Sequence, residues 1–152
     1  MKILVIEDDM NKLQNINKVL SEKNHKITEC YSYNSGLKAI IANYYDLLVL
    51  DMSLPTFDIK SSENGGRPKP FAGKEILRQL GRRQIKLKVI VVTQFEMFGD
   101  SQSPISLETL NNELREKYSS NYIGTVYYES SEKRWENQFL DILNGIGQDG
   151  KN

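Results

Sequence analysis

Asp46-Leu47-Leu48-Val49-Leu50-Asp51-Met52-Ser53-Leu54-Pro55 is the stretch of sequence that decides the fold. It joins a short apolar run to a carboxylate, and a proline follows soon after. An apolar run of this length, bounded by turn-forming residues, is typical of a strand buried on both faces of a parallel sheet. Asp51 would then lie at the carboxyl end of that strand, where ligands bind in open α/β sheets. The stretch therefore predicts an α/β protein with a functional carboxylate at Asp51.

A second stretch of the same kind opens the chain. Residues 1–6 are mostly apolar and are followed by Glu7-Asp8-Asp9. Asp9 is placed to cap the helix that follows. If the two strands are parallel neighbours, the other carboxylates meet Asp51 at one sheet edge and repel one another unless a cation holds them. The pattern predicts a cation site there.

Composition excludes several classes of protein. The chain has 152 residues, 39% of them hydrophobic and 26% charged, with a formal net charge of zero, which is typical of one globular domain without a basic face for nucleic acid. Cys30 is the only cysteine, so neither an internal disulfide nor a zinc motif is expected. The sequence contains no run of roughly 18 apolar residues and no signal-peptide pattern. A cytoplasmic protein that does not contact a membrane is expected.

Apolar periodicity alternates between strand and helix along the whole chain. Strands are predicted at 3–6, at 26–31, in the run ending at Asp51, at 88–93 and at 122–128. Helices are predicted after each strand, starting near Asp9, at Ser32 or Asn34, near Lys74, at Ser106, and at Ser130 or Ser131. Such alternation predicts a single-domain, doubly wound, five-stranded parallel sheet with helices on both faces.

Two segments break this regularity. Residues 56–73 are rich in Gly, Pro, Ser and Asn, and residues 95–104 form a second long connection. Both exceed the usual connection of 2–6 residues, and both flank the predicted acidic edge, so they are expected to cover it or to present a partner surface. The domain is expected to span 1–146, followed by a frayed tail at 147–152.

These features together resemble the receiver domain of bacterial two-component response regulators. The matching residues are 3–9, 46–55 and 89–93, the last of which ends on Thr93. The resemblance covers the order of elements over essentially the whole chain. It implies a flavodoxin-like sheet with strand order 2-1-3-4-5.

The resemblance also implies a site. Asp51 would be the phosphoacceptor, forming an aspartyl-phosphate, and the hydroxyl of Thr93 would sense the phosphate. Asp8 and Asp51 would bind Mg²⁺ directly, Glu7 through water, and Ser53 through its backbone carbonyl. Mg²⁺ commonly takes one or two carboxylates together with waters and phosphate oxygens, which suits these residue types.

One family feature is missing. Receiver domains carry a lysine at the end of the fifth strand, usually followed by proline, whereas this chain has Tyr128 and Glu129 there. Thr125 stands where the family has an aromatic switch residue. A basic residue from elsewhere could replace the lysine, or the domain could have lost phosphorylation. The candidates near the long loop or the last helix are Lys60, Arg67, Lys69, Lys74 and Lys133.

The sequence therefore leaves three functions open. The first is a stand-alone receiver that takes a phosphoryl group from a sensor histidine kinase or phosphotransfer protein. It would signal through a downstream protein, or through a homodimer on the face of the fourth and fifth helices, without contacting nucleic acid. It would be no enzyme beyond self-phosphorylation and autodephosphorylation. The second is a pseudo-receiver, a phosphorylation-independent interaction module. The third, a phosphatase of the haloacid dehalogenase type, needs an aspartate where the chain has Ser53.

Overall fold

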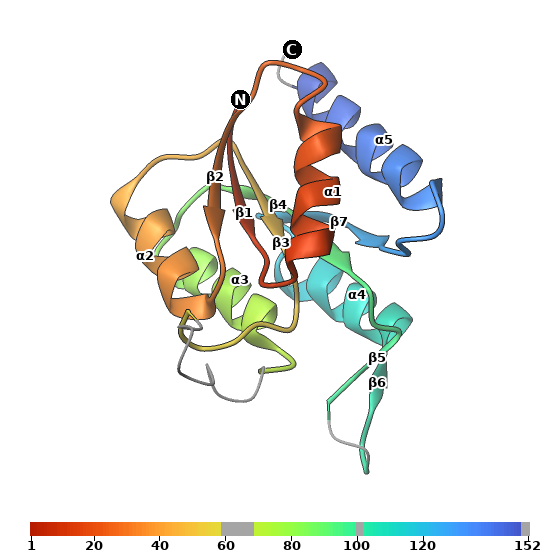
Figure 1. The fold of residues 1–152 in the computed structure, drawn as a ribbon. Coiled ribbons are helices and arrows are strands. Elements are labelled where there is room, and N and C mark those ends of the chain that lie inside the picture. The colour runs from red at the N-terminus through yellow and green to blue at the C-terminus, as the bar shows by residue number, and fades with distance from the viewer. Residues whose placement is uncertain (59–68, 100–101, 150–152) are drawn as a thin grey trace.

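A five-stranded parallel sheet forms the centre of the computed structural model, which describes residues 1–58, 69–99 and 102–149 (Figure 1). The strand order is β2-β1-β3-β4-β7, which confirms the predicted topology, with β7 as the fifth strand. The strands are β1 (Lys2–Ile6), β2 (Lys26–Cys30), β3 (Leu47–Leu50), β4 (Lys88–Thr93) and β7 (Tyr122–Tyr127).

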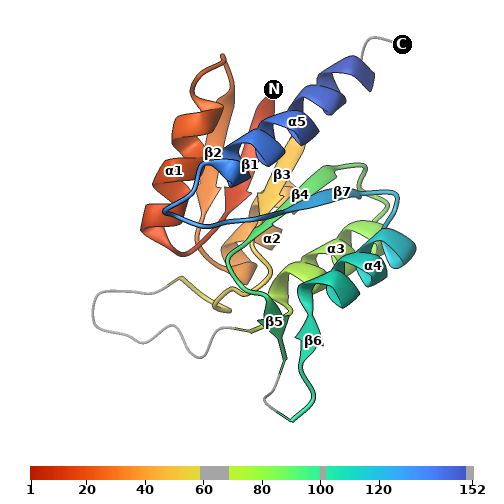
Figure 2. The same cartoon turned by 90° about the vertical axis from the view of Figure 1, so that its right-hand side faces the viewer.

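Helices cover both faces of this sheet (Figure 2). Two of them, α1 (Met10–Leu20) and α5 (Arg134–Asp149), bury their apolar side chains against one face. The other three pack on the opposite face: α2 (Tyr33–Ala42), α3 (Ala72–Arg82) and α4 (Leu107–Lys117). The predicted caps of three helices are present, because the side chains of Asp9, Ser32 and Ser106 accept hydrogen bonds from backbone amides of the first turn.

The register of the central strands aligns their carboxyl ends. Ile6, the last residue of β1, pairs with Leu50 of β3, and Leu50 pairs with Val91 of β4. All four residues of β3 are buried, as expected for a strand covered on both faces. The residues that follow β1 and β3 therefore emerge side by side at one edge of the sheet.

The two long connections differ from the prediction. Ala72 and Gly73 belong to the first turn of α3, so the first connection ends at Phe71; residues 59–68 lie outside the described part of the chain. The second connection is not all loop. It contains a short antiparallel hairpin of β5 (Met97–Phe98) and β6 (Ile105–Ser106), which projects from the body of the molecule (Figure 2).

The end of the chain also differs from the prediction. Ser130 and Ser131 lie in a turn, and α5 begins only at Arg134, so neither serine caps it. The helix continues to Asp149, so residues 147–149 are helical and not a frayed tail. Within the described residues, no helix has the length and apolar character needed to cross a membrane.

Candidate functional site: three carboxylates around a buried lysine

Three carboxylates meet at the carboxyl edge of the sheet. Glu7 and Asp8 follow β1, and Asp51 follows β3. Glu7 and Asp51 are buried and Asp8 is half-buried. One oxygen from each residue lies within 4.8 Å of the others. The structure thus brings together the three acidic side chains that the sequence placed at this edge.

Backbone amides fix the orientation of two of these carboxylates. The amides of Asp8 and Asp9 donate hydrogen bonds of 3.0 and 3.2 Å to Glu7 Oε2. The amide of Met52 donates one of 2.7 Å to Asp51 Oδ1. The remaining oxygens, Glu7 Oε1 and Asp51 Oδ2, both face the side chain of Lys12.

Lys12 is the cation of this site, although it was not among the site residues predicted from the sequence. Its Nζ lies 2.5 Å from Glu7 Oε1 and 3.4 Å from Asp51 Oδ2, and it donates a hydrogen bond of 2.7 Å to the carbonyl oxygen of Val92. The side chain is only 1% exposed. One ammonium group therefore contacts the carboxyl ends of three neighbouring strands, β1, β3 and β4.

The sequence does carry a signal for Lys12. It lies next to Leu13 and four residues before Ile16, and all three are buried on the sheet-facing side of α1. A lysine at a core-facing position of a helix needs a buried partner, since a buried charge is costly unless it is paired. Glu7, just before the helix, is one such partner, and Asp51, after β3, is the other.

The lysines and arginine predicted as replacements do not take this role. Among the described residues, Lys12 is the only cation that forms an ion pair with this acidic cluster, through Glu7 and Asp51. Lys74 pairs with Glu113 at 2.5 Å, Lys69 lies over the ring of Tyr33, and Lys133 is exposed. Lys60 and Arg67 lie outside the described residues.

Burial and mutual repulsion set the charges at the site. Burial, reinforced by the charge of Asp51, raises the pKa of Glu7 to about 8 although Lys12 opposes the shift. Burial and Asp51 likewise raise the pKa of Asp8. Burial alone would lower the pKa of Lys12, but the charges of Asp51 and Glu7 outweigh it and raise that pKa. Lys12 is therefore cationic at neutral pH. The three sets of oxygen donors also fit Mg²⁺, a hard cation that prefers such ligands.

The other predicted site residues lie around this cluster. Thr93 is fully buried at the end of β4, where its hydroxyl accepts a hydrogen bond of 3.2 Å from the amide of Phe95. Ser53 is half-buried, two residues after Asp51. Tyr128, which stands in place of the expected lysine, is buried. The centre of its ring lies 5.0 Å from that of Trp135, and its hydroxyl accepts a hydrogen bond of 2.7 Å from Asn15.

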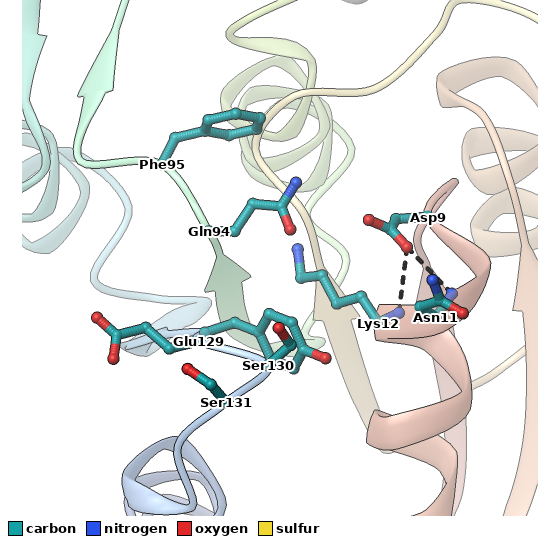
Figure 3. Close-up of a pocket in the computed structure, with 9 residues that line it drawn as sticks. Asp9, Asn11, Lys12, Gln94, Phe95, Glu129, Ser130 and Ser131 are labelled. Atoms are coloured by element: carbon teal, nitrogen blue, oxygen red, sulfur yellow. Dashed lines mark hydrogen bonds between the residues drawn. The ribbon is translucent and has the colours of Figure 1, made fainter.

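A cavity of about 660 Å³ opens beside the acidic cluster. In it, the side chain of Lys12 extends from α1 toward the end of β4, where Gln94 and Phe95 follow the strand (Figure 3). Tyr128 and Glu129, from the end of β7, line the same cavity. Lys12 and Tyr128 therefore line the same cavity, although they come from different elements. Tyr128 is the residue that stands where receiver domains carry a lysine.

Known proteins resemble this chain in sequence. The family model described as response regulator receiver domain matches residues 3–109. The Detocs response regulatory protein DtcB of Enterobacter cloacae is 28% identical over 144 residues, covering 92% of this chain and 96% of that protein. The uncharacterized protein y4jR of Sinorhizobium fredii is 31% identical over 140 residues, covering 90% of this chain and 92% of that protein.

A solved structure shares the fold. The response regulator protein TrrA of Thermotoga maritima, crystallised in complex with Mg²⁺-BeF, superposes with a TM-score of 0.58 over 93% of this chain and 97% of that one. The sequence identity is 17%, so this likeness concerns the fold alone.

Proposed function

This chain belongs to the response regulator receiver domain family of two-component signalling, and from that premise we propose that it accepts a phosphoryl group on Asp51 with the help of Mg²⁺. The observation that carries the proposal is the convergence of Glu7, Asp8 and Asp51 at one edge of the sheet. Three carboxylates so close together repel one another unless a cation lies among them, and a divalent cation there would also offset the negative charge of an incoming phosphoryl group.

In this proposal, the metal ligands are the carboxylates of Asp8 and Asp51, the carboxylate of Glu7 through water, and the backbone carbonyl of Ser53. When bound, Mg²⁺ would supply positive charge that offsets the phosphoryl oxygens and orients them. The crystallisation of TrrA with Mg²⁺-BeF supports the choice of metal. Two backbone amides hold Glu7 Oε2, so the orientation of this carboxyl group is fixed before a metal binds.

Asp51 acts as the nucleophile. A carboxylate oxygen of Asp51 forms a bond to phosphorus while the bond from phosphorus to the leaving group breaks. The leaving group, an imidazole nitrogen of a phosphohistidine or the acyl oxygen of a small acyl phosphate, keeps the electron pair of that bond. The hydrogen bond from the Met52 amide to Asp51 Oδ1 orients the carboxylate for this attack. The Thr93 hydroxyl would then leave the Phe95 amide and donate to a phosphoryl oxygen.

The phosphoryl donor would be a sensor histidine kinase or a phosphotransfer protein, and the output would pass to a downstream protein partner. Receiver domains generally act through such partners, mainly as signalling modules. Apolar side chains near the acidic edge support a partner surface here, because Phe57 and Met97 are 62% and 54% exposed. A homodimer through α4 and α5 is a second route for the output.

The test measures Mg²⁺ binding, then beryllofluoride binding at saturating Mg²⁺, by the fluorescence of Trp135. Phosphorylation by acetyl phosphate is followed in parallel on phosphate-affinity gels. Wild type should respond in all three assays, and Asp51→Asn should lose both beryllofluoride binding and phosphorylation. Asp141→Asn, on the exposed surface of α5, is the matched control and should behave like wild type. An Asp51→Asn variant that behaves like wild type would reject the proposal and favour the phosphorylation-independent interaction module.

A further inference from the structure

The position of Lys12 suggests more than a structural ion pair. Its ammonium group lies close to Glu7 and to the Val92 carbonyl, but the 3.4 Å contact to Asp51 Oδ2 is looser. That looser contact faces the proposed phosphoacceptor. A phosphoryl group bonded to Asp51 would bring new oxygens to the side of the cluster that Lys12 already occupies.

Charge favours a contact between them. A phosphoryl group adds about 1.5 to 2 negative charges at pH 7. The site already holds three acidic side chains, and among the described residues Lys12 is the cation that pairs with two of them, Glu7 and Asp51. Hydrogen bonds between ionised donors and acceptors are roughly twice as strong as neutral ones. An ammonium that is already desolvated at this edge would also lose no further hydration when it binds the phosphoryl oxygens.

The backbone of Lys12 is fixed in the helix, while its long side chain can move. Its backbone amide is fixed by a hydrogen bond of 3.2 Å to the capping carboxylate of Asp9. The four-carbon stem carries Nζ from this fixed point to the ends of β1, β3 and β4. A small rotation of the stem would exchange the Glu7 contact for a phosphoryl oxygen while the helix stays in place.

We propose that Lys12 supplies, from the first turn of α1, the ammonium group that binds the phosphoryl group on Asp51. This assignment rests on the proposed function. It also explains why Tyr128, just after β7, can replace the lysine of receiver domains. Lys12 of α1 provides the positive charge in the same cavity, and the ring of Tyr128 packs on Trp135.

The assignment makes two opposite predictions for one substitution. Lys12→Met removes a positive charge that repels Mg²⁺, so the affinity for Mg²⁺ alone should stay the same or rise. It also removes the phosphoryl contact, so beryllofluoride at saturating Mg²⁺ should bind about tenfold more weakly or worse, as expected for the loss of a hydrogen bond to a charged group. Lys18→Met, on the exposed side of the same helix, is the matched control and should change neither affinity.

The outcomes separate the two proposals. If wild type binds Mg²⁺ and beryllofluoride, and a folded Lys12→Met binds both equally well, the role of Lys12 is overturned while the proposed function stands. If wild type binds no beryllofluoride, the proposed function fails and this assignment fails with it.

A second measurement uses the wild type alone, and so does not depend on the folding of a variant. The side-chain ¹³Cε and ¹⁵Nζ resonances of Lys12 should shift when beryllofluoride is added to the Mg²⁺-loaded protein, and those of Lys18 should not. Lys12 resonances that stay unchanged while Trp135 reports binding would overturn the assignment.

Discussion

The backbone amide of Gly73 donates a hydrogen bond of 2.9 Å to the carbonyl oxygen of Met52, so the first turn of α3 lies directly against the backbone that follows Asp51. The approach is possible because residue 73 has no side chain. A Cβ at this position would lie 2.6 Å from the carbonyl oxygen of Asp51 and 2.9 Å from Cα of Met52. Both atoms belong to the backbone and cannot turn away as a side chain can.

Gly73→Ala is therefore expected to destabilise the protein by about 1–3 kcal/mol, the usual cost of overpacking a close contact. Gly81→Ala in the same helix is the matched control, because a Cβ there meets no atom within 4 Å. That control should raise the free energy of unfolding by roughly 0.5–1 kcal/mol, the helix-propensity difference between alanine and glycine. Urea unfolding measures both. Equal effects of the two substitutions would contradict the close approach.

The side chain of Asn121 is expected to be a strong local contributor to stability. It is buried, and its Nδ2 donates hydrogen bonds of 2.8 and 2.9 Å to the carbonyl oxygens of Ile85 and Leu87. Asn121→Ala should lower the free energy of unfolding by about 1–3 kcal/mol, since two hydrogen bonds at about 0.5–1.5 kcal/mol each are lost.

Asn121→Asp should be worse than Asn121→Ala, because its carboxylate would face two carbonyl oxygens instead of donating to them. Asn43→Ala is the control, since Asn43 is exposed and its side chain donates a long hydrogen bond of 3.4 Å to the Ala39 carbonyl. Its effect should stay within about 0.5 kcal/mol. An aspartate variant as stable as wild type in urea would show that the amide does not hold these two carbonyls.

Tyr128 is expected to couple α1 to the end of β7. Its hydroxyl accepts a hydrogen bond of 2.7 Å from Asn15, while its ring packs on Trp135. Tyr128→Phe should destabilise the protein by about 1 kcal/mol, because only the hydrogen bond is lost and the ring contact stays. In a double-mutant cycle with Asn15→Ala, urea unfolding should give a coupling energy of about 0.5–1.5 kcal/mol. Fully additive effects would show that the two side chains do not interact.

Cys30 is expected to be unreactive in the folded protein. It is buried, and burial raises the pKa of its thiol, so little thiolate is present at pH 8. A thiol reagent such as dithionitrobenzoate should modify Cys30 slowly in buffer and promptly in denaturant. The control carries Cys30→Ser with Ile41→Cys, because residue 41 is 51% exposed, and it should react at once when folded. Equal rates for the two folded proteins would contradict the burial of Cys30.

Local sequence patterns predicted most of the fold correctly. The strands β3 and β4 are buried on both faces of the sheet, so their sequences are continuous apolar runs that are easy to recognise. The capping residues Asp9, Ser32 and Ser106 mark where three of the helices start. The errors lie where the local pattern is weak. The β5–β6 hairpin has only two residues per strand, and α5 starts at Arg134, beyond the two serines that were expected to cap it.

By itself, the sequence determined the positions of Glu7, Asp8, Asp51 and Thr93. The carboxyl ends of parallel strands share one edge, and each of these residues ends an apolar run or lies within two residues after it. Only the tertiary structure decided which cation joins them. Lys12 is 80 residues from Val92 along the chain, yet its ammonium donates to that residue's carbonyl while facing Glu7 and Asp51. That contact depends on how α1 packs across β1, β3 and β4, because a helical side chain finds distant partners only once the helix is docked on the sheet.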